Sequence, residues 1–82
     1  MKDARIVAFG RTVRELRTAK GITQEAFAHT SGLDRSYFGH IERGSKNVTL
    51  RMIYQIADGL GMTVVELLQA VQDNQEKHDR KI

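Results

Sequence analysis

The sequence predicts a single all-α domain built from five helices. Five segments carry apolar residues at the three- and four-residue spacing of a helix. Threonine, aspartate or glycine stands at most of their ends, where helices start and stop. Strand-like alternation is sparse and the chain has no proline. With 82 residues and 40% apolar content, the chain can build one small core. We expect the domain over residues 1–71 and a frayed polar tail over residues 72–82.

The first helix is expected over residues 5–20. Its apolar residues recur at helical spacing: Ile6, Phe9, Val13 and Leu16. Gly21 follows at the position where helices often end in left-handed backbone. Arg17 lies at the edge of the apolar stripe, where an unpaired charge would be costly. This favours an acidic partner such as Glu42, which also lies on the inward flank of its helix.

Two short helices separated by a glycine turn are expected next, over residues 24–30 and 35–43. Thr23 can cap the first of them with its hydroxyl. Gly32 permits a tight turn that a residue with a Cβ would resist, and Asp34 is the next N-cap candidate. The chain should therefore form helix, turn and helix in this region.

The second of these two helices has a face that suits the major groove of DNA. At about 100° per residue, Phe38 and Ile41 point inward. The outward face and its flanks carry the candidate base-contacting residues: Arg35, Ser36, Tyr37, His40 and Arg43. Basic residues at both ends, with hydrogen-bonding side chains between them, fit entry into the groove. A solvated helix face is the alternative from this helix alone.

Positive charge is concentrated around this helix. The whole chain has a net charge of +3, which favours nucleic acid without being decisive. Within residues 35–51 a single acid, Glu42, stands against four basic residues: Arg35, Arg43, Lys46 and Arg51. Such clustering is typical of nucleic-acid-binding proteins.

Three further polar residues are candidates for phosphate contacts. Gln24 begins its helix, so its amide and the free backbone N–H groups can meet a phosphate or can simply be solvated. Lys46 and Asn47 lie in the polar loop after Gly44. One interpretation is that Lys46 and Asn47 contact the phosphate backbone of DNA. The alternative is that the loop is a flexible connector with a solvated lysine.

The fourth and fifth helices complete the domain. Val48 anchors the loop inward and Thr49 caps the fourth helix, which has the following apolar residues: Leu50, Ile53, Tyr54, Ile56, Ala57 and Leu60. Gly61 ends it. Thr63 and Glu66 have the spacing of a capping box, and the fifth helix carries an apolar stripe: Val64, Leu67, Leu68 and Val71.

Three apolar residues lie off the centres of these two stripes: Met52, Met62 and Val65. Scattered exposed apolar residues are ordinary in soluble proteins. Their grouping near the last two helices nevertheless makes them candidates for a two-fold interface.

The run from residue 9 to residue 68 resembles the Xre/Cro/CI family of helix-turn-helix repressors. The family pattern places a glycine before Thr-Gln, then an alanine, a turn glycine and a Glu-Arg ending of the recognition helix. The matching residues are Gly21, Thr23, Gln24, Ala28, Gly32, Glu42, Arg43 and Gly44. The segment from Leu33 to Leu50 looks especially like the controller proteins of restriction-modification systems, which are small dimeric regulators.

The resemblance implies a lambda-repressor-like domain that binds double-stranded DNA as a bacterial transcriptional regulator. It implies that Arg17 pairs with Glu42 to tie the first helix to the recognition helix, and it favours the phosphate role for Gln24. It also favours a homodimer on a palindromic or pseudo-palindromic operator. The alternative is an antitoxin-type module that binds a partner protein and regulates its own gene, although only the short tail would be available to capture a toxin.

Other chemistries find little support in the sequence. The chain has no cysteine, its three histidines show no metal-site spacing, and no serine, histidine and acid form a recognisable catalytic motif. We therefore expect no metal, no cofactor and no enzymatic activity. The N-terminal segment lacks the long apolar run of a signal peptide or membrane span, which makes the cytoplasm the expected location.

Overall fold

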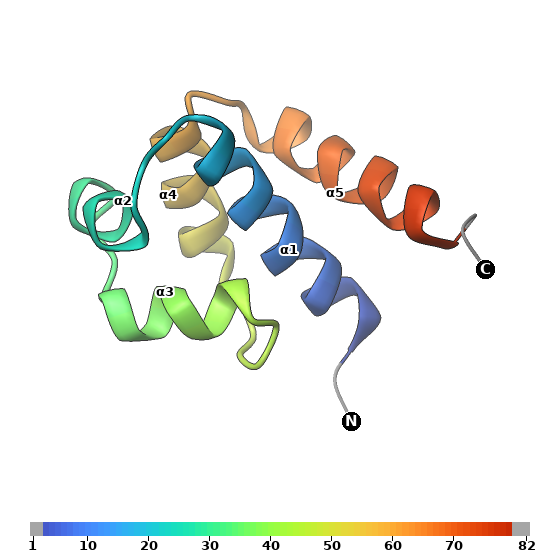
Figure 1. Cartoon of the computed structure of the whole chain (residues 1–82), viewed down its shortest axis with the longest axis horizontal. Coiled ribbons are helices and arrows are strands. Elements are labelled where there is room, and N and C mark those ends of the chain that lie inside the picture. The colour runs from blue at the N-terminus through green and yellow to red at the C-terminus, as the bar shows by residue number, and fades with distance from the viewer. Residues whose placement is uncertain (1–2, 80–82) are drawn as a thin grey trace.

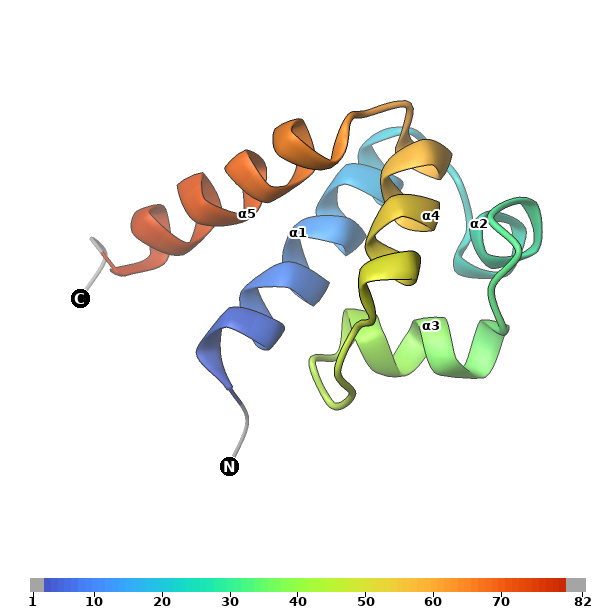
Figure 2. The same cartoon turned by 180° about the vertical axis from the view of Figure 1, so that it is seen from behind.

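The structure, a computed structural model, describes residues 3–79. This part of the chain forms an all-α fold with five helices: α1 (Ala4–Ala19), α2 (Gln24–Thr30), α3 (Arg35–Glu42), α4 (Leu50–Leu60) and α5 (Val64–Asp79). Helix α1 lies in the middle of the molecule, with α5 along one side and α2, α3 and α4 on the other (Figures 1 and 2). The all-α fold with five helices is confirmed.

One core joins all five helices. Its buried apolar residues are Ala8, Phe9, Val13, Phe27, Ala28, Phe38, Ile41, Ile56, Ala57, Leu60, Leu67 and Val71. The rings of Phe27 in α2 and Phe38 in α3 stack, with centroids 5.1 Å apart and planes inclined by 24°. Such aromatic pairs contribute about 0.5–1.5 kcal/mol beyond the area they bury. The helix-turn-helix unit is therefore held together by its own core contacts as well as by α1.

The helix starts expected from the sequence are confirmed by side-chain caps. Thr23, Asp34 and Thr49 each accept a hydrogen bond from the backbone N–H three residues later. Thr63 and Glu66 form the reciprocal capping box, each side chain accepting from the other's backbone N–H. These bonds satisfy donors that a helix start would otherwise leave unpaired.

Helix α1 has a cap that the sequence analysis did not identify. The Asp3 carboxylate accepts hydrogen bonds from the backbone N–H and the guanidinium of Arg5. The side-chain hydrogen bond from Arg5 is the main cause that lowers the pKa of Asp3 to about 2. This cap therefore stays charged across the physiological pH range.

The expectation of a frayed tail from Gln72 is wrong for residues 72–79, which continue α5 without a break. The reason is a polar contact with α1. The Asn74 amide donates to Thr12 Oγ1 at 2.9 Å and to Glu15 Oε1 at 3.0 Å. Thr12 is buried and donates in turn to the carbonyl of Ala8. The remainder of the expected tail, residues 80–82, lies outside the described residues.

Three of the apolar residues named for the fourth and fifth helices are exposed. Leu50, Tyr54 and Leu68 are 68%, 55% and 41% exposed, respectively. They belong to α4 and α5, whose buried faces are narrower than the apolar content of these segments indicates. No helix of the described chain is both long and apolar enough to cross a membrane.

Candidate nucleic-acid interface

The unit α2, turn and α3 places α3 along one end of the molecule (Figure 1). Gly32 makes the turn between the two helices with a φ of 72°, a left-handed conformation that favours glycine. The inward residues Phe38 and Ile41 are fully buried, as expected. Arg35 and Ser36 at the start of α3 are exposed and can face a ligand.

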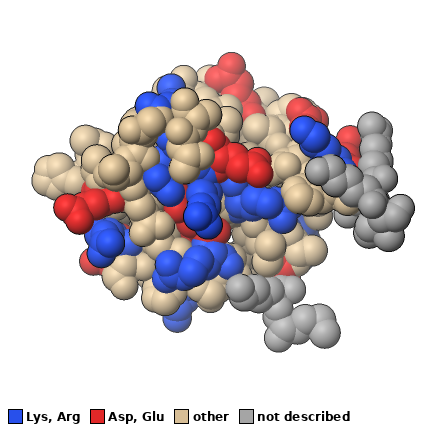
Figure 3. All heavy atoms as spheres, viewed as in Figure 1, with Lys and Arg blue, Asp and Glu red and all other residues tan. Residues whose placement is uncertain are grey.

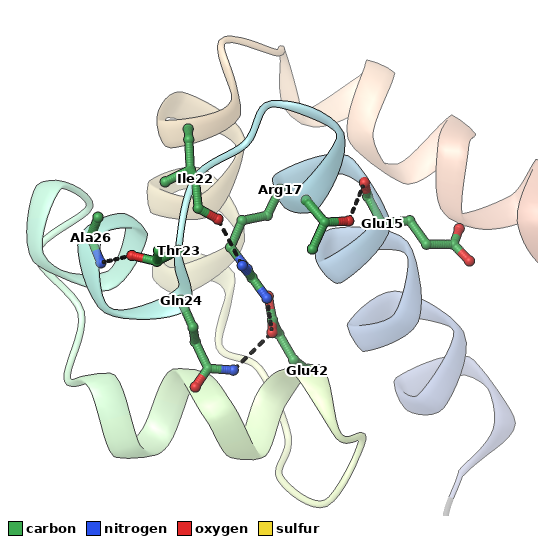
Figure 4. A network of polar contacts seen from close by, with 8 residues as sticks. Glu15, Arg17, Ile22, Thr23, Gln24, Ala26 and Glu42 are labelled. Atoms are coloured by element: carbon green, nitrogen blue, oxygen red, sulfur yellow. Dashed lines mark hydrogen bonds and ion pairs between the residues drawn. The ribbon is translucent and has the colours of Figure 1, made fainter.

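A buried ion pair joins α1 to the C-terminal end of α3. Arg17 Nε donates to Glu42 Oε2 at 2.7 Å, and Arg17 Nη2 donates to Glu42 Oε1 at 3.0 Å. The two side chains are only 9% and 2% exposed. Arg17 Nη1 also donates to the carbonyl of Ile22 at 2.7 Å (Figure 4). This bidentate geometry, with a third bond to the backbone, offsets the cost of removing two charges from water.

Gln24 belongs to the same network. Its amide nitrogen donates to Glu42 Oε1 at 2.9 Å (Figure 4), so the side chain is neither simply solvated nor fully free for a phosphate. The sequence analysis missed this contact because it considered only the place of Gln24 at the start of α2. The Thr23 cap takes the Ala26 N–H, so the N–H groups of Gln24 and Glu25 are the ones at this helix start that an anion can meet.

The outward face of α3 divides into two parts. Arg35 and Ser36 are exposed at its N-terminal end. Arg35 Nε lies 3.8 Å from Glu25 Oε2, with both side chains largely exposed, and such surface pairs contribute little. At the C-terminal end, His40 Nδ1 lies 3.3 Å from Arg43 Nη2 and 3.3 Å from Ser45 Oγ.

Tyr37 lies differently from the other candidate base-contacting residues. It is half-buried against the core, and its hydroxyl donates to the carbonyl of Asn47 at 2.8 Å. The phenol therefore ties α3 to the loop that carries Lys46. This loop is further anchored by Val48, which packs against the core as expected.

Many of the basic residues lie on one face of the molecule. Figure 3 shows Lys and Arg side chains gathered over α1 and α3 on the face seen in Figure 1. Arg14 contributes from α1: it follows Gly10 by one turn, and a Cβ on Gly10 would overlap the carbonyl oxygen of Ile41 in α3. Arg14 is exposed, so it adds charge beside α3 that the sequence analysis did not assign to the site.

The candidate interface residues between subunits are not equally accessible. Met52 and Met62 are half-buried and pack against the core, whereas Val65 is 78% exposed. Three further apolar residues are exposed on α4 and α5: Leu50, Tyr54 and Leu68. Leu68 also lines a cavity of about 550 Å³ between α1, α5 and Val48.

Among residues 3–79, no group of three or more histidine and acidic side chains is placed to hold a metal ion. The candidate base-contacting and phosphate-contacting residues offer hydrogen-bonding groups and positive charge.

Residues 8–70 match the family model described as a helix-turn-helix domain.

Several relatives are controller proteins of restriction-modification systems. Control protein C.MunI of Mycoplasma sp is 40% identical over 88% of this chain and 97% of its own length. The crystal structure of the controller protein C.AhdI from Aeromonas hydrophila is 52% identical over 79% of this chain and 98% of that one, with a TM-score of 0.76. The controller protein C.Esp1396I, crystallised as a tetramer with its natural 35 base-pair operator, is 31% identical over 87% of this chain and 93% of that one, with a TM-score of 0.81.

Proposed function

The chain belongs to the helix-turn-helix domain family, and we propose that it regulates transcription as a homodimer with one α3 in each of two successive major grooves. It is a sequence-specific DNA-binding transcriptional regulator. The observation that carries the proposal is the outward face of α3, which is polar and basic while the opposite face is locked into the core. A helix fixed in this way can present base-reading side chains with little loss of freedom.

Base contacts are assigned to the outward face of α3. Arg35 and Arg43 have the fork geometry that reads guanine O6 and N7, and Ser36 and His40 can donate or accept at base edges. The hydroxyl of Tyr37 already donates to the carbonyl of Asn47. In contact with a base, Tyr37 would therefore accept a hydrogen bond or make an apolar contact. Its first role is to hold the loop against α3.

Phosphate contacts are assigned to the residues that flank α3. The α2 start contributes the backbone N–H groups around Gln24, at the positive end of the helix dipole. The loop contributes Lys46 and Asn47, which are exposed and are held near α3 by Tyr37. These contacts would set the register of the protein on the duplex without reading its sequence.

The homodimer is supported by the surface of α4 and α5. Four exposed apolar side chains lie on these helices: Leu50, Tyr54, Val65 and Leu68. A two-fold pairing there would remove them from water and would present two copies of α3 to half-sites about 34 Å apart. Met52 and Met62 would contribute at the margins. The relative C.Esp1396I was crystallised as a tetramer on its operator, which supports assembly of this kind on DNA.

The biological role that we propose is control of a restriction-modification system, from the cytoplasm and without catalysis of its own. It is supported by the relatives C.MunI and C.AhdI, which are named as controllers of this kind. A methyltransferase or endonuclease gene beside the gene for this chain would support the role. A neighbouring toxin gene would favour the antitoxin alternative.

The test is selection of binding sites from a random duplex library, followed by footprinting and sedimentation of the complex. We expect a site with two related halves, protection centred on two successive major grooves, and two chains per site. A strictly monomeric protein with no sequence preference at physiological salt would contradict the proposal.

A further inference from the structure

Gly39 lies at the centre of the outward face of α3, four residues after Arg35 and four before Arg43. It is buried, whereas Arg35, Ser36 and Arg43 around it are exposed. A Cβ on Gly39 would stand 3.2 Å from Arg43 Nη1, 3.5 Å from Arg43 Nη2 and 3.2 Å from Gln24 Oε1. The guanidinium of Arg43 and the amide oxygen of Gln24 therefore border this position so closely that a methyl group there would push them back by a few tenths of an ångström. We call this space the Gly39 slot.

The groups around the Gly39 slot are oriented from two sides. On one side, the Gln24 amide nitrogen donates to Glu42 Oε1, so the buried ion pair sets the direction of the amide oxygen. On the other side, His40 Nδ1 contacts Arg43 Nη2 and Ser45 Oγ, each at 3.3 Å. An arginine that is oriented before binding loses less rotamer entropy when it meets a base.

We propose that Gly39 is a specificity-determining position, because its missing Cβ lets the Arg43 guanidinium lie close against α3, the orientation in which it would meet a base. The inference rests on the proposed DNA-binding function. Gly39 is a positioning residue that acts through Arg43 and makes no base contact of its own. A Cβ there would meet only the ends of flexible side chains, so the side chains would shift and the fold would not.

Gly10 has a different role. A Cβ on Gly10 would overlap the backbone carbonyls of Ile41 and Glu42, which cannot move without separating α1 from α3. Gly10 is therefore required for packing, whereas Gly39 is dispensable for packing.

The test is Gly39→Ala, with DNA duplexes selected by the wild-type protein from a random library. We expect the melting temperature to be equal to or higher than that of the wild type, since alanine is favoured over glycine inside a helix. Affinity for the selected duplex should fall about tenfold, and discrimination against a mismatch at the base pair read by Arg43 should fall with it. Binding to an unselected duplex should not change. In the DNA-free protein, the NMR signal of Arg43 Nε should shift.

The double variant that combines Gly39→Ala with Arg43→Ala decides whether Gly39 acts through Arg43. This double variant should bind DNA no more weakly than Arg43→Ala alone, because there is then no guanidinium to displace. Additive losses, unchanged discrimination in Gly39→Ala or a lowered melting temperature would each overturn the inference. If the wild type itself shows no sequence preference, the proposed function fails. If the wild type and Arg43→Ala differ as expected while Gly39→Ala behaves as wild type, only the inference on Gly39 fails.

Discussion

At the scale of single residues, a substitution of Glu42 should change the stability of the fold, whereas a substitution of Arg35 should change DNA recognition. Glu42 is buried and bonded to Arg17 and Gln24, so Glu42→Gln leaves the Arg17 charge unmatched in a dry site. We expect a loss of about 3–5 kcal/mol in the free energy of unfolding, measured by thermal or denaturant melts. Binding titrations on the refolded variant would show whether α3 keeps its orientation.

Arg35→Ala is the matched change on the exposed face of the same helix. It should alter the free energy of unfolding by less than about 0.5 kcal/mol, because Arg35 makes only the long surface pair with Glu25. It should cost about 1–3 kcal/mol of binding and relax preference at one base pair. Equal falls in melting temperature for Arg35→Ala and Glu42→Gln would show that the outward face is wrongly assigned.

At the scale of elements, the side chain of Asn74 holds the second half of α5 to α1. Asn74 donates to Thr12 and Glu15, and none of residues 72–78 belongs to the buried apolar core. Asn74→Ala should cost about 0.5–1.5 kcal/mol and should speed amide hydrogen exchange in residues 72–79. DNA affinity should not change. Exchange rates equal to those of the wild type would mean that the helix persists without the contact.

The loop between α3 and α4 carries the charge expected to meet phosphate. Lys46→Ala should weaken binding to all sequences alike and reduce the slope of log K against log salt by about one unit. Lys77→Ala is the control, since Lys77 is equally an exposed lysine but lies near the far end of α5. Titrations between low and physiological salt measure both slopes. A sequence-dependent loss for Lys46→Ala would instead indicate base contact.

At the scale of the whole molecule, the proposed function requires two copies of α3 to be paired. Val65 is 78% exposed, so its replacement should leave the monomer fold intact. Val65→Glu would place two carboxylates in the two-fold interface and should raise the dimer dissociation constant at least tenfold, which is about 1.4 kcal/mol. Val65→Thr keeps the side-chain shape without charge and is the matched control. Analytical ultracentrifugation gives the dissociation constants, and an unchanged value for Val65→Glu would place the interface elsewhere.

Local chemistry is what the sequence by itself determined about this protein. Helix starts at Thr23, Asp34, Thr49 and Thr63 follow from side chains that bond backbone only three residues away, and the turn at Gly32 follows from the freedom of one residue. The inward residues Phe38 and Ile41 follow from helical periodicity. These features depend on neighbours in the chain, so a linear pattern is sufficient to predict them.

Features that depend on partners distant in the chain were decided only by the tertiary structure. Periodicity cannot show that Asn74 meets Thr12, and so it missed the extension of α5. It also grouped Leu50, Tyr54 and Leu68 with the apolar residues of their helices that are buried, because apolar character alone does not tell which side of a helix finds a packing partner. Gln24 and Arg43 converge on Gly39 because α2 packs across α3. That crossing results from the balance of all core contacts, which no single segment contains.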